Sequence, residues 1–262
     1  MVPVLETKIY NRIENMKDFK YPIENDFKHI PLNDNDIHDR LIDLNLFCGY
    51  NVQYHQLLEG GGIDHRRDFL RIINIVGNTN YNYGLEWCSG PGVIGFELLG
   101  AGIVNKVGFI DLHKPAIDSI HLNAERNGLL DKITTFNTDK IREINTEEKF
   151  DLVIGNPPHA FDYNDYVKEQ MSIGNDWTDV EDHPYWDNQV RIDVDLGMGA
   201  HREFFDSIKG KITDDCDIFI SEMGPYDNVT EFAKQNGFYV VADWTMTSAL
   251  KGGGKLLHFK LK

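Results

Sequence analysis

Residues 85–95 read LEWCSGPGVIG, and this stretch points most directly to the fold. An apolar strand ends at Trp87, a glycine turn follows, and an apolar run from Val93 begins a helix. Gly90 and Gly92 let backbone amides approach a ligand, and the amino-terminal end of the helix adds positive partial charge. Because ordinary strand-to-helix turns also use glycines, the stretch alone leaves a structural and a ligand-binding interpretation open.

The sequence around this loop alternates between short apolar runs and helical stretches, which is typical of a parallel α/β sheet. Helices are predicted over residues 93–99 and 116–124, and the second of them stops at 127–128. The predicted strands are residues 83–87, 106–110, 133–136, 150–154, 217–221, 238–242 and 256–261.

Residues 1–80 and 161–200 depart from this alternation. The second stretch is acidic and rich in aromatic side chains, and we interpret it as a functional insert. In the first, Asp64 is the expected N-cap of a helix that stops at Gly77. The first stretch is expected to be a mostly helical auxiliary segment, from a weak apolar periodicity at Ile37, Leu41, Leu44 and Leu46.

The composition is that of a folded domain with a strong acidic excess. The chain has 262 residues, with 26 Lys and Arg against 42 Asp and Glu, and a formal net charge of −16. This charge argues against broad electrostatic wrapping of nucleic acid. The 3 cysteines form no CxxC pair, so neither a disulfide framework nor a metal site is expected. With no secretory signal or long apolar run visible, we expect a cytoplasmic protein with no membrane partner.

Two acidic residues near the glycine loop indicate what kind of ligand the loop could bind. Asp111 ends the next predicted strand, about 20 residues after the loop, where a carboxylate is placed to bind ribose hydroxyls. An isolated Asp111 would be better explained as a helix cap. Glu86 lies in the strand end before the glycine loop, where a dinucleotide site would have glycines because a pyrophosphate must lie close to the backbone. A carboxylate there suits a cofactor that carries a cationic amino-acid part.

Residues 156–159 read NPPH and follow the predicted strand 150–154. Two consecutive prolines fix the backbone, so the carbonyls of Asn156 and Pro157 can point at a ligand. Together with the side-chain carbonyl of Asn156, they can hold both hydrogens of a planar NH₂ group. This arrangement would aim the nitrogen lone pair at an incoming methyl group, and alignment is most of what a protein must add to such a transfer.

The order of Glu86, the glycine loop, Asp111, Asp139 and the NPPH tetrad resembles class I S-adenosylmethionine-dependent methyltransferases over roughly residues 80–262. The resemblance implies a Rossmann-like α/β domain over residues 81–262 with a seven-stranded sheet, and S-adenosylmethionine as cofactor. In this family the tetrad implies methylation of a nitrogen conjugated to a π system.

The resemblance also assigns roles at the cofactor. Glu86 would hold the cofactor end of the loop and Asp111 the ribose hydroxyls. Leu112 would pack on the adenine, and Asp139 would accept a hydrogen bond from the adenine amino group. From the residues alone, Asp139 fits a helix cap before Ile141 equally well. The remaining cofactor-binding candidates are Cys88, Ser89, Gly90, Gly92 and Asn156.

At the acceptor, the expected catalytic residues are Asn156, Pro157 and His159. The family usually has Tyr or Phe at the fourth tetrad position, and His159 is a flat ring that can stack but also titrate. A general base is less needed, because an amide or aryl amine can lose its proton after transfer. Further candidates for contact with the substrate are Pro158, Tyr185 and Trp186.

We expect a protein or small-molecule acceptor, on charge alone. One alternative is an RNA or DNA base methyltransferase, which requires a positive patch near the tetrad. Another alternative, of a different class, is a non-catalytic protein that binds S-adenosylmethionine, in which cofactor binding does not depend on Asn156. The candidate residues for the positive patch are Lys8, Lys17, Lys20, Arg66, Arg67 and Arg71.

Overall fold

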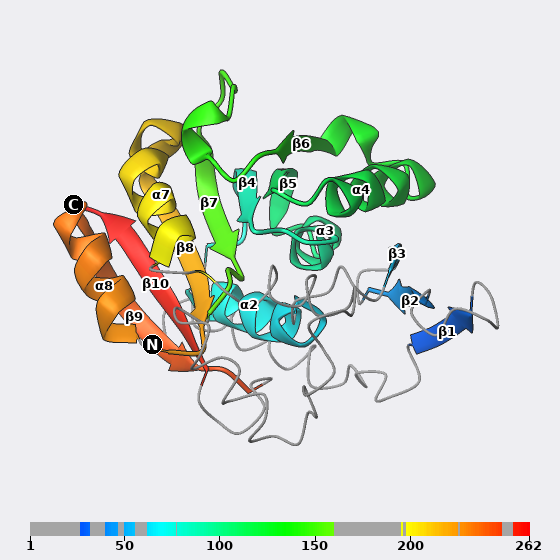
Figure 1. The fold of residues 1–262 in the computed structure, drawn as a ribbon, viewed down its shortest axis with the longest axis horizontal. Helices are drawn as coiled ribbons and strands as arrows, with labels where there is room; N and C mark the ends of the chain where they lie inside the picture. Colours follow the sequence, from blue (N-terminus) through cyan, green and yellow to red (C-terminus); the bar gives the residue numbers. More distant parts are fainter. Residues whose placement is uncertain are drawn as a thin grey trace, which may run out of the picture.

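A seven-stranded sheet forms the centre of the computed structural model, in the order β6-β5-β4-β7-β8-β10-β9 (Figure 1). Neighbouring strands from β6 to β8 are parallel, and β10 runs antiparallel to both β8 and β9. The predicted Rossmann-like sheet is therefore confirmed. Its strands are β4 (Tyr81–Trp87), β5 (Val104–Asp111), β6 (Ile133–Asn137), β7 (Phe150–Gly155), β8 (Ile212–Glu222), β9 (Phe238–Thr245) and β10 (Lys255–Leu261).

The structure describes residues 27–31, 40–46, 50–55, 62–76, 78–159, 195, 198–224, 226–247 and 254–262. Its helices are α2 (Gly62–Val76), α3 (Val93–Gly100), α4 (Lys114–Arg126), α7 (Gly199–Ser207) and α8 (Tyr226–Gln235), with short 3₁₀ turns η2 (Leu130–Lys132), η3 (Ile141–Glu143) and η6 (Ile208–Lys211). None of the helices in these residues is long and apolar enough to span a membrane.

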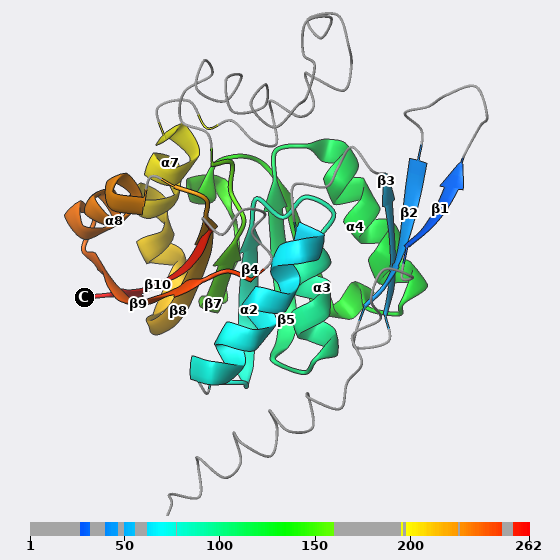
Figure 2. The same ribbon diagram turned by 90° about the horizontal axis from the view of Figure 1, so that it is seen from below.

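Helices cover both faces of the sheet (Figures 1 and 2). One buried cluster joins the sheet to α2, α3 and α4, and the other joins it to α7 and α8. The central strand β7 shows why both faces are covered. Its side chains alternate between the clusters, with Leu152 and Ile154 in the first and Val153 in the second. A run of buried apolar residues without polar alternation is typical of a central parallel strand.

The amino-terminal part of the chain differs from its expected helical structure. It contains a three-stranded antiparallel sheet, β1 (Phe27–Pro31), β2 (Arg40–Asn45) and β3 (Asn51–His55), in that order. The helix predicted from the apolar periodicity is therefore wrong for the described residues 40–46. Ile42, Leu44 and Leu46 also repeat with period two, and pairing with two neighbouring strands decided between the patterns.

Helix α2 is the helical part of this segment, and it packs against α3. It starts at Gly62, so Asp64 lies inside its first turn and the expected N-cap is wrong. Packing of α2 against α3 compensates for the low helix propensity of Gly62, so the helix starts before Asp64.

Asn123 of α4 and its C-cap residue, Asn127, attach the small sheet to the domain. The side chain of Asn123 accepts a hydrogen bond from the Gln53 backbone N–H at 2.8 Å and donates to the Gln53 carbonyl at 2.8 Å. Asn127 forms the same pair of bonds with Asn51. The two side-chain amides thus form the hydrogen bonds that a neighbouring strand would form with the backbone of β3. Figure 2 shows the small sheet on the outer side of α4.

We expect Asn123→Ala to lower the free energy of unfolding by about 1–3 kcal/mol, because a fully buried side chain loses both bonds to Gln53. Urea unfolding of the full chain measures this change. Glu125→Ala is the matched control, since this exposed residue lies on the same helix. Equal losses in the two variants would show that the amide pairing does not stabilise the domain.

Candidate active site

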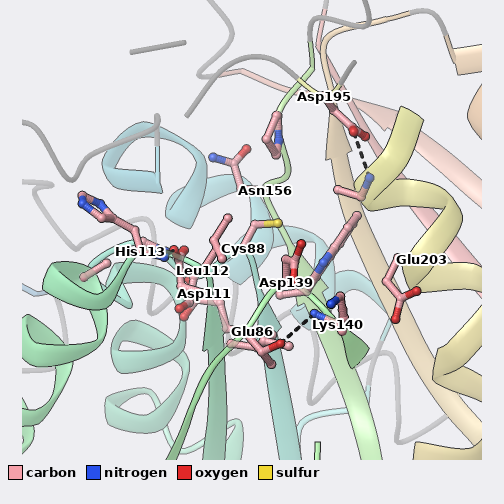
Figure 3. A pocket seen from close by; sticks show the side chains of 18 of the residues that line it. Glu86, Cys88, Asp111, Leu112, His113, Asp139, Lys140, Asn156, Asp195 and Glu203 are labelled. Atoms are coloured by element: carbon pink, nitrogen blue, oxygen red, sulfur yellow. Dashed lines mark hydrogen bonds between the residues drawn. The ribbon is translucent and has the colours of Figure 1, made fainter. Parts of the chain in front are cut away.

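A pocket of about 560 Å³ lies where the carboxyl ends of β4, β5 and β7 meet the start of α7 (Figure 3). The strand order reverses here, because β4 is followed by β5 on one side and β7 by β8 on the other, and ligands of open α/β sheets bind at such points. The volume falls within the roughly 300–1,000 Å³ of small-molecule sites. Of the candidates from the sequence, the lining includes Glu86, Cys88, Ser89, Gly90, Asp111, Leu112, Asp139, Asn156 and Pro158.

The other candidates lie elsewhere. Gly92, Pro157 and His159 are described but are not among the lining residues. Tyr185 and Trp186 lie outside the described residues, as does most of the acidic stretch 161–200. Sequence reasoning did not assign several residues that do line the pocket, among them His113, Lys140, Arg142, Asp195 and Glu203.

The glycine loop is shaped by tight packing as well as by the pocket. Gly92 has a φ of 77°, and a Cβ there would lie 2.9 Å from the ring of Phe109. Cys88 also has a positive φ, of 53°, which is unusual for a residue with a side chain. Position 92 therefore requires a glycine because of its close packing against Phe109 of β5. Gly90, in contrast, lines the pocket.

Glu86 connects the end of β4 to the amino terminus of α3. Its Oε2 accepts a hydrogen bond from the Gly95 backbone N–H at 2.7 Å, and only 2% of the residue is exposed. Burial raises the pKa of Glu86 to about 8, although the helix amides act in the opposite direction. A cationic group bound nearby would favour the carboxylate form, because opposite charges stabilise each other most strongly away from water.

Asp111 connects the glycine loop to the end of β5. Its Oδ2 accepts a hydrogen bond from the Gly90 N–H and its Oδ1 one from the His113 N–H, both at 2.7 Å. Burial raises the pKa of Asp111, and these two amides lower it. His113, not Asp111, occupies the N-cap position of α4, so the simple capping interpretation does not hold. Each carboxylate oxygen keeps a second lone pair for a ligand.

Leu112 and Asp139 lie at the open side of the pocket. The Leu112 residue is 65% exposed and lines the pocket, which leaves its apolar side chain accessible to a flat ring. Asn137 holds this corner by donating to the carbonyls of Asp111 and Leu112. Asp139 is exposed, and Lys140 occupies the N-cap position of η3, so capping does not explain Asp139.

The NPPH tetrad follows β7, and Asn156 reaches the pocket (Figure 3). Its Oδ1 accepts hydrogen bonds from Ser221 Oγ at 2.6 Å and from His65 Nδ1 at 2.8 Å. These partners from β8 and α2 occupy both lone pairs and fix the plane of the amide. No local pattern in the sequence indicated either partner, since His65 and Ser221 are far from the tetrad along the chain.

Next to the tetrad lies a buried group of acids and histidines. Asp195 and Glu222 each lie 2.7 Å from one ring nitrogen of His201, and Glu222 also approaches His159. Asp195 accepts hydrogen bonds from the first backbone amides of α7 as well. Among the described residues, no cluster of three or more His, Cys, Asp or Glu is arranged to hold a metal ion.

These features agree with a comparison to known protein families. Residues 72–171 match the family model of the methyltransferase small domain. The matched range includes the glycine loop, Asp111 and the NPPH tetrad, and the structure adds the sheet order and the pocket around them.

Solved structures share this methyltransferase fold. TYW2 of M. jannaschii, in complex with AdoMet, has 14% identity and a TM-score of 0.54, with 86% of this chain and 88% of that chain covered. The glycopeptide N-methyltransferase MtfA, complexed with S-adenosylmethionine, has 12% identity and a TM-score of 0.51 over 78% and 95%. The tRNA m1G37 methyltransferase of M. jannaschii has 17% identity and a TM-score of 0.51 over 85% and 57%.

The residues of the pocket fit S-adenosylmethionine. Asp111 keeps lone pairs for ribose hydroxyls, and the exposed Leu112 lies beside it. Ser89 Oγ is buried at the pocket and has no hydrogen-bond partner among the described residues, as expected of a group that binds a ligand. The family match and the shared fold support S-adenosylmethionine as the cofactor.

Proposed function

We propose that the chain is an S-adenosylmethionine-dependent methyltransferase that transfers the methyl group to a planar nitrogen of a protein or small-molecule acceptor. The observation that carries the proposal is the tetrad at the end of β7, with Asn156 lining the pocket beside the glycine loop. The bound cofactor supplies an electrophilic methyl group on a sulfonium, and the chain contributes binding and alignment.

In the proposed cofactor site, the residues at the two ends of the pocket bind different parts of S-adenosylmethionine. Asp111 accepts hydrogen bonds from the ribose hydroxyls, and Leu112 covers the adenine. Asp139 accepts a hydrogen bond from the adenine amino group. Glu86 stabilises the cationic amino-acid end through the glycine loop. Cys88, Ser89 and Gly90 line the remainder of the methionine part, and Gly92 supports them through its packing on Phe109.

The proposed acceptor site uses Asn156 and the backbone carbonyl of Pro157. Because Asn156 Oδ1 already accepts two hydrogen bonds, an incoming N–H must replace one of the donors. We assign that exchange to His65, since it is the longer bond and comes from a different layer of the fold. Ser221 then keeps the amide in place, while Pro158 and His159 form the wall beside the acceptor.

Charge favours an acceptor without a phosphate backbone. The lining of the pocket carries more acidic than basic side chains, with Glu86, Asp111, Asp139, Asp195 and Glu203 on the acidic side. Nucleic-acid enzymes need basic groups to displace counterions from phosphates. The names of the similar structures mention both tRNA and a glycopeptide, so they support either type of acceptor.

The alternative nucleic-acid acceptor requires a basic patch near the tetrad, and two of the candidate arginines, both on α2, pair with acidic residues instead. Arg66 is 6% exposed and lies 3.5 Å from Glu97, and Arg71 pairs with Asp68 at 3.0 Å. Arg67 is exposed, and Lys8, Lys17 and Lys20 lie outside the described residues. The engaged arginines weaken this alternative.

The acceptor class is tested with S-adenosylmethionine that carries a labelled methyl group and the wild-type chain. Protein, RNA and low-mass fractions of a cell extract are supplied separately, each with a protease-treated or ribonuclease-treated duplicate. We expect label in the protein or low-mass fraction that ribonuclease does not remove. Label that disappears only with ribonuclease would replace our proposal by the nucleic-acid alternative.

We expect Asp111→Asn to weaken S-adenosylmethionine binding by about 1–3 kcal/mol, because a charge-assisted hydrogen bond to the ribose is lost. Isothermal titration calorimetry measures the change. Asp131→Asn, at an exposed position in η2 outside the pocket, is the matched control. Unchanged affinity in Asp111→Asn would contradict the ribose assignment.

A further inference from the structure

A continuous line through the interior consists of four side chains, those of Asp195, His201, Glu222 and the tetrad residue His159. His201, on α7, is fully buried with its Nδ1 2.7 Å from Asp195 Oδ2 and its Nε2 2.7 Å from Glu222 Oε1. Both ring nitrogens face carboxylates, so both must carry a proton if the acids are ionised. Burial alone lowers the pKa of His201, but Glu222 and Asp195 raise it to about 9. His201 is therefore an imidazolium at neutral pH.

The second oxygen of Glu222 faces the tetrad. Glu222 Oε2 lies 3.7 Å from His159 Nδ1, and neither atom has a hydrogen-bond partner among the described residues. The Glu222 side chain is 0% exposed and that of His159 is 19% exposed. Burial alone raises the pKa of Glu222, but the adjacent His201 and His159 lower it below its ordinary value. A buried carboxylate oxygen without a donor is costly, which suggests a use for it.

Within the described part of the chain, few other titratable groups lie near His159 and Glu222. Facing His159 from α2 is His65, with ring centroids 6.5 Å apart. Burial is the main cause of the raised pKa values of Cys88, after β4, and Tyr226, on α8, and the nearby charge of Glu222 raises both further. Trp87 packs edge-on against the His201 ring at 5.3 Å and keeps water from it. Thus Glu222 is the carboxylate nearest to His159 among the described groups.

On the basis of the proposed function, we propose that His159 accepts the proton released by the acceptor nitrogen and that Glu222, held by His201 and Asp195, positions it. Glu222 accepts a hydrogen bond from His159 Nδ1–H, which leaves the lone pair on Nε2. Such hydrogen bonds are often long before the substrate is bound and shorten when it arrives. His159 is the catalytic residue, and Glu222, His201 and Asp195 are positioning residues.

The step is balanced without a further reactant. The acceptor nitrogen uses its lone pair to form the bond to the methyl carbon, and the bond from that carbon to the sulfonium breaks with its electrons on sulfur. As this bond forms, the acceptor nitrogen releases one N–H proton to His159 Nε2. The resulting imidazolium lies beside the Glu222 carboxylate, which stabilises it.

Glu222→Gln provides a sharp test, because His201 decides how the new amide is oriented. His201 donates from Nε2, so the glutamine must present its carbonyl oxygen to His201 and its NH₂ group to His159 Nδ1. A donor at that position accepts no proton from Nδ1. We therefore expect His159 to change from the Nδ1–H tautomer in the wild type to the Nε2–H tautomer in the variant, which removes the lone pair from Nε2.

The tautomer is read from the ring ¹⁵N chemical shifts of His159 in the full chain, without cofactor or acceptor. In the same variant, we expect kcat to fall by roughly 10²-fold, as on loss of a general base, and its pH profile to change. S-adenosylmethionine affinity should remain unchanged. Glu147→Gln, at an exposed position before β7, is the matched control for both measurements.

A second variant, His159→Gln, removes the proton acceptor and keeps the three buried partners. The double variant should lose no more turnover than either single one, because both changes affect the same step. An unchanged tautomer in Glu222→Gln, or a changed tautomer with normal turnover, would overturn the proposal. If the wild type transfers methyl groups to none of the acceptors, the proposed function fails, and the tautomer measurement still reports separately on the contact between Glu222 and His159.

Discussion

Asn156→Ala should abolish methyl transfer while S-adenosylmethionine affinity stays within a few-fold of the wild type. The reason is geometric, since the amide of Asn156 is fixed by Ser221 and lines the pocket where the acceptor nitrogen must approach. Loss of a group that orients the reacting atoms typically lowers kcat by roughly 10²–10³-fold. Turnover with labelled cofactor and calorimetric titration measure the two quantities.

A control separates the chemical role of Asn156 from its structural one. Ser221→Ala removes the same 2.6 Å hydrogen bond between the two residues but keeps the amide. We expect this variant to lose less turnover than Asn156→Ala, because the amide is held less firmly but is still present. If Asn156→Ala kept near-normal turnover, the alignment of a planar nitrogen would be wrong, and a non-catalytic cofactor-binding role would become the better explanation. Equal losses in the two variants would reduce Asn156 to a structural residue.

Asp217→Asn should destabilise the domain by about 2–3 kcal/mol at neutral pH without affecting the pocket. Asp217, on β8, accepts hydrogen bonds from Tyr81 on β4 and from His258 on β10, and pairs with Lys260 at 2.9 Å. Burial alone raises the pKa of Asp217, but these partners lower it to about 2. Three strands are thereby connected through one carboxylate.

The sign of the pH dependence follows from the lowered pKa. The stability that this carboxylate contributes is present above its unfolded pKa of about 3.8 and is lost as the pH falls through about 2. Urea unfolding at neutral and acidic pH should therefore show a smaller loss of stability on acidification in Asp217→Asn. Asp214→Asn, at an exposed position on the same strand, is the control. Equal pH dependence in the wild type and Asp217→Asn would contradict this role.

The seven strands of the main sheet could be predicted because each carries its own signal. β7 contains a run of consecutive buried apolar residues, and β4 ends in the glycine loop that starts α3. The ends of the strands then bring Glu86, Asp111 and Asn156 to one pocket, since the carboxyl ends of parallel strands meet at one edge of the sheet. These positions follow from local pattern together with topology.

The small sheet and the hydrogen-bond partners in the site could not be predicted from the sequence, because they depend on contacts between distant segments. The strands β1–β3 are short, and their pairing with each other and with Asn123 and Asn127 decides their structure. The partners of Asn156 and the line from Asp195 to His159 join residues from α2, α7 and β8. No spacing along the chain encodes such contacts.

The charge of −16 proved less informative than the position of single carboxylates. Most of the acidic stretch 161–200 lies outside the described residues, but Asp195 from that stretch is buried against His201. Glu222, which no motif indicated, contributes a second buried carboxylate at the same histidine. The position of these two acids next to the tetrad, and not the net charge of the chain, determines the chemistry that they can support.

The most direct test of the central claim is a calorimetric titration of the wild-type chain with S-adenosylmethionine. We expect saturable binding of one cofactor per chain, with a Kd between about 1 μM and 1 mM, the usual range of enzyme substrate affinities. S-adenosylhomocysteine should compete for the same site. Absence of binding at millimolar cofactor would contradict the assignment of the pocket, and with it the proposed methyl transfer.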